Sequence, residues 1–97
     1  MYEIEWTQYS KDDYNGLDGS QKVFVDKALD RIKLLGMKAG QPLNGDLALC
    51  NKLKNRKMGL RIVFREANGN VEVIQIVAIG KREKETVYKA AEKRISR

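Results

Sequence analysis

The chain has 97 residues, which is enough for one domain with a modest hydrophobic core, and its formal net charge is +6. With one cysteine and no histidine it can form neither an internal disulfide nor a zinc site of the ordinary ligand types. We expect no metal and no small-molecule cofactor. The N-terminus lacks the pattern of a signal peptide and no apolar run approaches membrane-spanning length, so we expect a cytoplasmic protein without a membrane partner.

The first half of the chain predicts one short strand followed by two helices. Residues 2–6 alternate polar and apolar side chains, which is typical of a short edge strand. Ser10 can cap a short helix that ends near residues 16–19, and Ser20 can cap a longer helix that closes over residues 36–40. Apolar residues of the longer helix recur at helical spacing, and we expect these in the core: Val23, Phe24, Val25, Ala28, Ile32 and Leu35.

After a loop through residues 42–45 the pattern changes to the alternation typical of strands. Three strands are expected, over residues 47–56, 60–66 and 71–79, with turns at 57–59 and at Asn68-Gly69. The third strand is almost wholly apolar, so we expect it to be central in the sheet and covered. A last helix is expected from Glu83 to about Ser96, with an inner stripe of Val87, Ala91 and Ile95.

This order of elements predicts an α+β fold. We expect a small antiparallel sheet, made of the N-terminal edge strand and a three-strand meander, packed by the two N-terminal helices, with a C-terminal helix. One domain should span residues 1–97.

Basic side chains gather in the second half of the chain. Residues 1–45 contain six Lys/Arg and seven Asp/Glu, a net charge of −1, whereas residues 46–97 contain thirteen and six, a net charge of +7. Strand alternation lets Lys52, Lys54 and Arg61 project together from the open side of the sheet, if the helices cover its Leu/Ile/Phe side. Arg82 joins them from the end of the adjacent strand. Such residues can simply solubilise a sheet face, but clustered like charges repel, so the cluster favours an anionic partner, either a nucleic acid or an acidic protein.

The segment over residues 74–88 adds an aromatic ring to this cationic edge. An apolar strand runs into Gly80, a basic cluster and a helix that carries Tyr88 one turn in. The phosphate backbone of a nucleic acid binds such basic side chains, and an unstacked base can stack on the tyrosine ring. The alternative interpretation is a solvated helix start after a core strand.

Several strings in the second half resemble the RelE branch of the RelE/ParE toxin superfamily. They are CNKLK from Cys50, GLRIVF from Gly59, IGKREKETVYK from Ile79 and EKRI from Glu92, and the resemblance covers roughly residues 47–96. It implies the RelE-like microbial RNase-type fold and the toxin of a type II toxin–antitoxin system. It also implies a ribosome-dependent, metal-independent endoribonuclease that cleaves mRNA in the A site by 2′-hydroxyl attack, inhibiting translation. The implied partners are a cognate antitoxin, the ribosome and mRNA.

The resemblance also implies a role for individual residues. Lys52 and Lys54 fall on the family's catalytic lysines, proposed to activate the 2′-hydroxyl and hold the phosphate. Arg61 falls on the arginine that stabilises the pentavalent phosphate, and Arg82 on the arginine that assists the leaving 5′-oxygen. Tyr88 falls on the tyrosine that stacks on a base. Further basic residues expected to bind RNA are Arg56, Lys57, Lys81 and Lys84.

The chemistry of these side chains limits the roles they can take. Free lysine titrates near ~10.4, so a lysine base near neutral pH needs its pKa lowered by about 2–3 units. Neighbouring cations lower it and a bound phosphate raises it again, so we expect Lys52 and Lys54 to act mainly as phosphate cations. Guanidinium hardly deprotonates, so Arg61 and Arg82 should act by electrostatic stabilisation. Both arginines are expected on the open face, where they bury little.

Two other functions fit the same scaffold. A ParE-like inhibitor of DNA gyrase binds a protein target and cleaves nothing, and the combination of Arg82 with Tyr88 favours the nuclease over it. A degenerate relative would only bind nucleic acid or antitoxin. Functional residue types at all five key positions argue against that alternative.

Overall fold

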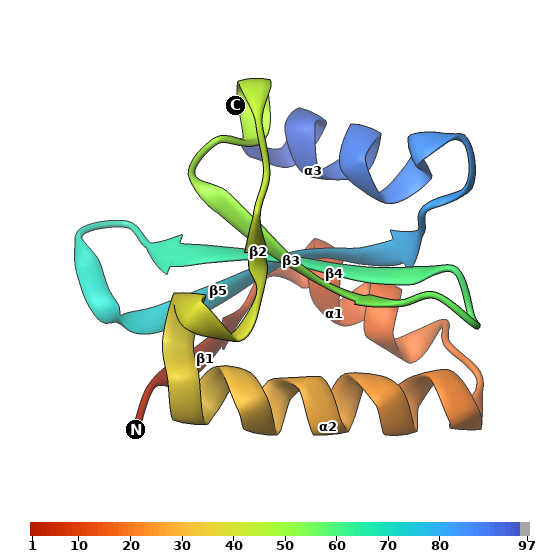
Figure 1. Ribbon diagram of the computed structural model, residues 1–97, viewed down its shortest axis with the longest axis horizontal. Helices are drawn as coiled ribbons and strands as arrows, with labels where there is room; N and C mark the ends of the chain where they lie inside the picture. The colour runs from red at the N-terminus through yellow and green to blue at the C-terminus, as the bar shows by residue number, and fades with distance from the viewer. Residues whose placement is uncertain (96–97) are drawn as a thin grey trace.

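The computed structural model describes residues 1–95, so the predicted helix end at Ser96 lies outside the described residues. Its strands and α-helices are β1 (Glu3–Trp6), α1 (Gln8–Asn15), α2 (Gly19–Leu35), β2 (Gln41–Pro42), β3 (Cys50–Asn55), β4 (Leu60–Ala67), β5 (Asn70–Lys81) and α3 (Thr86–Ile95). Short 3-10 helices connect them at η1 (Gly36–Ala39), η2 (Gly45–Leu47) and η3 (Glu83–Glu85). The sheet lies between α3 on one side and α1 with α2 on the other (Figure 1).

The sheet has the strand order β1-β5-β4-β3-β2, which confirms the α+β fold class and the central place of β5 and β4. It is mixed rather than wholly antiparallel, because β1 runs parallel to β5. Alternation of side chains reports which face a residue occupies but not the direction of the strand, so the sequence pattern could not reveal this. The edge strand β2, which pairs with residues 51 and 52 of β3, was not predicted either, since it has two residues and one is Pro42.

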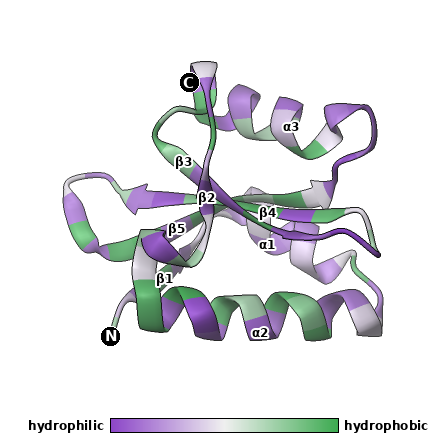
Figure 2. Ribbon diagram, in the orientation of Figure 1, coloured by the Kyte–Doolittle hydropathy of each residue, from purple (hydrophilic) through white to green (hydrophobic). Residues whose placement is uncertain are grey.

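The first hydrophobic core fills the space between the sheet and the two N-terminal helices. Leu60, Ile62 and Phe64 alternate onto this face of β4, as predicted, and are fully buried. Figure 2 shows apolar residues, in green, along both α2 and β4. The α2 residues that meet them are Val25, Ala28 and Ile32, with Phe24 partly buried.

Two predicted core residues of α2 are exposed. Val23 is 53% exposed and Leu35 is 38% exposed. A helix lying on a sheet buries one stripe at i, i+3 and i+7, and the residues at 25, 28 and 32 occupy that stripe. Val23 and Leu35 lie beside it.

A second core lies on the opposite face of the sheet, under α3. Val87 and Ala91 pack there against Val63 and Val77, and Ile95 is partly buried beside them. The predicted inner stripe of the last helix is therefore confirmed. The face expected to be open is partly covered by α3, which changes the surroundings of the basic residues that project from it.

The helix caps differ from those expected. Thr7 caps α1, with its Oγ1 accepting from the Ser10 backbone N–H at 3.0 Å, and Ser10 is buried as the third residue of the helix. Asp18 caps α2 by accepting from the Gln21 backbone N–H at 2.8 Å. Ser10 and Ser20 as caps were wrong, because each is preceded by an equally capable oxygen-bearing residue that starts the helix earlier.

The elements around the basic cluster also start later than predicted. Leu47 belongs to η2, and β3 begins at Cys50. The regular helix α3 begins at Thr86, because Lys84 and Glu85 adopt positive φ angles of 54° and 56°. No helix within residues 1–95 is long and apolar enough to cross a membrane.

Candidate functional site

Five basic side chains line one cavity of about 440 Å³ at the end of the sheet where β5 leads into α3. They are Lys52 and Lys54 of β3, Arg56 in the following turn, Arg61 of β4, and Arg82 directly after β5. Gly59 completes the lining, so no described carboxylate forms part of the wall. We call this cavity the cationic pocket. It brings together the four cations that the sequence predicted to converge and adds Arg56.

Strand register places these residues side by side. Lys54 lies opposite Arg61 across the β3–β4 pair, and Arg61 lies opposite Gly80 across the β4–β5 pair. Opposite residues on one face have Cβ atoms about 4.5–5.5 Å apart, which sets the spacing of their charges. Arg82 is held at the same end because its backbone N–H donates to the Gly59 carbonyl at 2.8 Å. Gly59 has a φ of 65°, the left-handed conformation that glycine adopts without strain.

Arg61 is buried rather than open to solvent, with 6% of its surface exposed. It sits on the central strand, flanked on both sides by neighbours from β3 and β5, and the prediction of a poorly buried side chain was wrong. Its Nη1 donates to the Leu60 carbonyl at 3.0 Å and to the Asn55 carbonyl at 3.4 Å. Its Nε is a buried donor without a partner among the described residues. A fixed cation with a spare N–H is suited to an anion.

Lys54 has an altered acidity in this cluster. The positive charge of Arg56 lowers the pKa of Lys54 below its ordinary value, and partial burial and the charges of the other pocket cations lower it further. Like charges disfavour an added proton, so Lys54 holds more of the neutral amine than a solvated lysine does at the same pH. A bound anion would act in the opposite direction.

Tyr88 lies beside the cationic pocket, next to Lys52. The Lys52 Nζ lies 5.9 Å from the centroid of the Tyr88 ring, within the range of a cation–π contact. The ring also packs, partly buried, against the second core, and it lines a neighbouring cavity of about 320 Å³ rather than the cationic pocket itself. Tyr88 therefore combines a packing contact with a partly accessible ring beside the cations.

The remaining predicted basic residues surround the pocket without lining it. The Lys81 Nζ donates to the Met58 carbonyl at 3.0 Å, which secures the turn between β3 and β4. Lys57 lies exposed in that turn, and Lys84 lies exposed in η3. Their roles stay predictions.

An ion pair that the sequence did not reveal anchors the helix carrying Tyr88. Arg94 Nη1 of α3 donates to Asp13 Oδ2 of α1 at 2.7 Å and to the Val77 carbonyl of β5 at 2.9 Å. The same Asp13 oxygen accepts from the Ile79 backbone N–H at 3.0 Å. The two partners are 81 positions apart, and neither stands out in the local pattern. This contact ties α1, α3 and β5 together.

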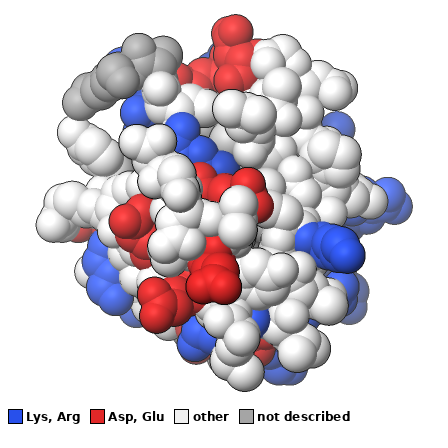
Figure 3. Space-filling model, turned by 90° about the vertical axis from the view of Figure 1, so that its left-hand side faces the viewer, with Lys and Arg blue, Asp and Glu red and all other residues white. Residues whose placement is uncertain are grey.

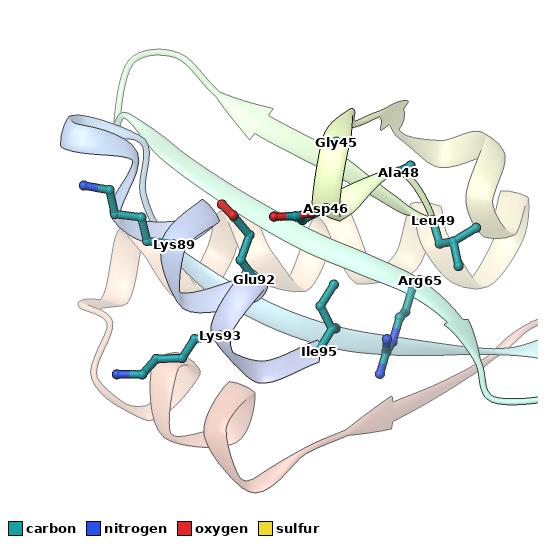
Figure 4. A pocket seen from close by; sticks show the side chains of 9 residues that line it. All are labelled: Gly45, Asp46, Ala48, Leu49, Arg65, Lys89, Glu92, Lys93 and Ile95. Atoms are coloured by element: carbon teal, nitrogen blue, oxygen red, sulfur yellow. The ribbon is translucent and has the colours of Figure 1, made fainter. Parts of the chain in front are cut away.

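A larger cavity of about 760 Å³ lies between α3, η2 and the start of β3 (Figure 4). Its wall mixes both charges with apolar side chains, and Asp46 and Glu92 point toward one another across it. The end of the molecule with the β4–β5 hairpin carries a central group of acidic side chains (Figure 3). The cationic pocket is smaller than this cavity and differs from both regions in that the charged residues of its described lining are all basic. Within residues 1–95 no group of three His, Cys, Asp or Glu residues could hold a metal ion.

Comparison with solved structures finds the same fold in bacterial toxins. A mutant of the E. coli toxin RelE in the free state has a TM-score of 0.79 and 26% identity, covering 97% of both chains. The isolated E. coli RelE toxin has a TM-score of 0.73 and 26% identity, covering 98% of this chain and 99% of that one. The RelBE2 toxin–antitoxin complex of Mycobacterium tuberculosis matches at a TM-score of 0.68 and 18% identity, over 84% of this chain and 98% of that one. No protein-family profile and no curated protein sequence matches the chain.

Proposed function

We propose that the chain, which has the fold of the E. coli RelE toxin, is a RelE-family toxin of a type II toxin–antitoxin pair. We further propose that it cleaves mRNA in the ribosomal A site. The observation that carries the proposal is the cationic pocket, in which five cations converge with no lining carboxylate. Clustered like charges destabilise a fold, so their convergence is explained by a polyanionic substrate.

The pocket supplies what RNA cleavage by its own 2′-hydroxyl requires. That reaction needs in-line geometry, removal of a proton and stabilisation of negative charge on the phosphoryl oxygens. Lys54 is the better-suited proton acceptor, since its pKa is lowered. Lys52, held over the Tyr88 ring, serves as a phosphate cation.

The two arginines act by charge. Arg61 is fixed by its buried hydrogen bonds, so it does not reorganise when the pentavalent phosphate forms, and this preorganisation strengthens its stabilising effect. Arg82 is exposed at the end of β5, where it can approach the leaving 5′-oxygen as the strand of RNA enters. Neither guanidinium has to give up a proton.

The partners follow from the same surface. Arg56 in the lining binds the RNA backbone, and Lys57, Lys81 and Lys84 outside the lining add further positive charge that binds it. Tyr88 stacks on and orients one base, a contact worth roughly 1–3 kcal/mol. The intact E. coli RelBE and M. tuberculosis RelBE2 structures are toxin–antitoxin complexes. For this chain we propose a cognate antitoxin that presents an acidic segment to the basic half.

A purified translation reaction tests this function. Toeprinting on a defined message should show cleavage within the A-site codon when the chain and programmed ribosomes are both present. Arg31→Ala serves as the matched control, because Arg31 is exposed on α2 and does not line the pocket, and it should cleave like the parent. An intact message, together with inhibition of gyrase supercoiling by the same preparation, would contradict the nuclease and support the ParE-like alternative.

A further inference from the structure

The cationic pocket is a cradle for a small tetrahedral anion as well as for a polymer. Its volume of about 440 Å³ exceeds many times the roughly 30 Å³ that one water occupies in the liquid. Five cations line it, and the buried Nε of Arg61 is a donor with no partner among residues 1–95. The charges of these cations attract an anion, and a bound anion offsets the cost of the buried Arg61 charge.

The same cavity holds an amine that can act as a nucleophile. A lysine reacts with acylating agents only through its neutral form, and the charge of Arg56 lowers the pKa of Lys54. Lys52 is placed differently, because its Nζ lies over the Tyr88 ring, whose negative face attracts an ammonium group. A bound phosphate group raises the pKa of Lys54 again, and the proximity of donor and amine in one pocket offsets this effect. Lys54 is the pocket amine that we expect to react.

We propose that Lys54 is a modification site for acyl phosphates, whose phosphate group is held by the cations of the pocket while the acyl group is transferred to Lys54 Nζ. The lone pair of the neutral amine forms a C–N bond to the carbonyl carbon. The C–O bond to phosphate breaks, inorganic phosphate leaves with the electron pair, and the amine proton passes to phosphate or to solvent. No further reactant is needed.

This inference goes beyond the proposed nuclease and shares only the pocket with it. The product is an uncharged amide at the centre of the cluster, so acylation removes one of the five charges. A modified chain should bind anions in the pocket more weakly than the parent. Small metabolites with an activated acyl group would in this way lower the activity of the site.

The test compares two acetyl donors on the whole folded chain. Acetyl phosphate carries the anionic group and N-hydroxysuccinimidyl acetate does not. Peptide mass spectrometry gives the acetylation rate at each lysine, and Lys27 and Lys33 on α2 are exposed references outside the pocket. For each donor we take the ratio of the acetylation rate at Lys54 to the rate at Lys27. This ratio should be about tenfold higher with acetyl phosphate than with the uncharged donor, because a charged cleft concentrates an oppositely charged ligand by about tenfold or more.

Two controls distinguish binding of the donor's phosphate group in the pocket from the intrinsic nucleophilicity of the Lys54 amine. Inorganic phosphate should slow acetylation of Lys54 by acetyl phosphate but not acetylation of Lys27. Arg82→Gln should slow the Lys54 reaction severalfold, whereas Arg31→Gln should not change it. Equal donor ratios at Lys54 and Lys27, or a Lys54 rate indifferent to both phosphate and Arg82→Gln, would overturn the inference.

The result is read by mass and does not depend on RNA cleavage. An unreactive Lys54 in a chain that cleaves mRNA would refute acylation and leave the proposed function standing. A selectively acetylated Lys54 in a chain that never cleaves mRNA would support acylation and refute only the nuclease.

Discussion

The burial of Arg61 is set by its neighbours in the sheet as well as by its own strand. Its alternation along β4 predicts which face it occupies, but not that neighbours on both sides would bury it to 6% exposure. A buried cation next to four others, with an unpartnered Nε, costs stability unless an anion is present. We therefore propose that Arg61 serves the function of the pocket rather than the stability of the fold.

This argument predicts opposite effects of one substitution on stability and activity. Arg61→Met keeps the buried stem and removes the charge, so the free energy of unfolding should rise by about 1–2 kcal/mol. Cleavage should lose about 2–4 kcal/mol of transition-state stabilisation, roughly 30- to 1,000-fold in single-turnover rate. Arg82→Met is the matched control, because Arg82 is exposed: the rate should fall similarly with little change in melting temperature. A destabilised Arg61→Met chain that cleaves normally would assign Arg61 to the structure alone.

The Tyr88 ring packs against the second core, and we propose that it also stacks on a base, so two substitutions test what the ring and its hydroxyl each contribute. Tyr88→Phe keeps the ring, which both the stacking on a base and the packing require, so most activity should remain. Tyr88→Ala should abolish base stacking and, since the ring packs partly buried against the second core, cost about 1–2 kcal/mol of stability. Full activity of folded Tyr88→Ala chain would remove the ring from the site.

Lys54 links charge to the pH dependence of cleavage. If neutral Lys54 accepts the proton, the rate rises with pH through a pKa that lies below the ordinary lysine value. Arg56 is the largest cause of that lowering, so Arg56→Gln should raise the pKa of Lys54 and move the rising limb of the profile to higher pH. Lys57→Gln, in the same turn but outside the pocket lining, is the control. A limb that stays in place in Arg56→Gln would identify Lys54 as a phosphate cation only.

At the scale of elements, hydrophobic period and turn chemistry were sufficient to predict most strands and helices. The strands β4 and β5 and the inner stripe of α3 follow directly from alternation and helical spacing. Cap positions did not, because Thr7 and Ser10 are both good caps and only their geometry decides. Nor could the pattern show that α3 crosses the face that carries the basic residues, since a strand's alternation does not identify the helix that covers it.

The ion pair between Arg94 and Asp13 holds α3 across this face together with the apolar contacts of the second core. Its side chains are 22% and 20% exposed, and Asp13 also accepts from a backbone N–H of β5. Asp13→Ala should therefore cost about 1–3 kcal/mol, the range for hydrogen bonds to charged groups, and reduce hydrogen-exchange protection in α3. Asp12→Ala, at the adjacent exposed position, should stay within about 0.5 kcal/mol. Equal stability of the two variants would contradict an anchoring role.

Across the whole molecule, charge is segregated. The cations converge where β5 leads into α3, whereas the end with the β4–β5 hairpin shows a central acidic group (Figure 3). The sequence predicted one cationic face from the net charges of its two halves, because consecutive strands of a meander bring nearby basic residues together. It did not predict the acidic group at the hairpin end. Nor could it show that Arg61 is buried within the cluster, which depends on strand register and on the neighbours from β3 and β5.

The central claim is that the cationic pocket organises attack of a 2′-hydroxyl on the adjacent phosphate. The most direct measurement uses a message in which the nucleotide preceding the scissile phosphate carries a single 2′-deoxy substitution, cleaved on programmed ribosomes beside the all-ribose message. The all-ribose message should give a 2′,3′-cyclic phosphate and a free 5′-hydroxyl, and the 2′-deoxy message should stay intact at that position. Cleavage of the 2′-deoxy message at the parent rate would contradict the account.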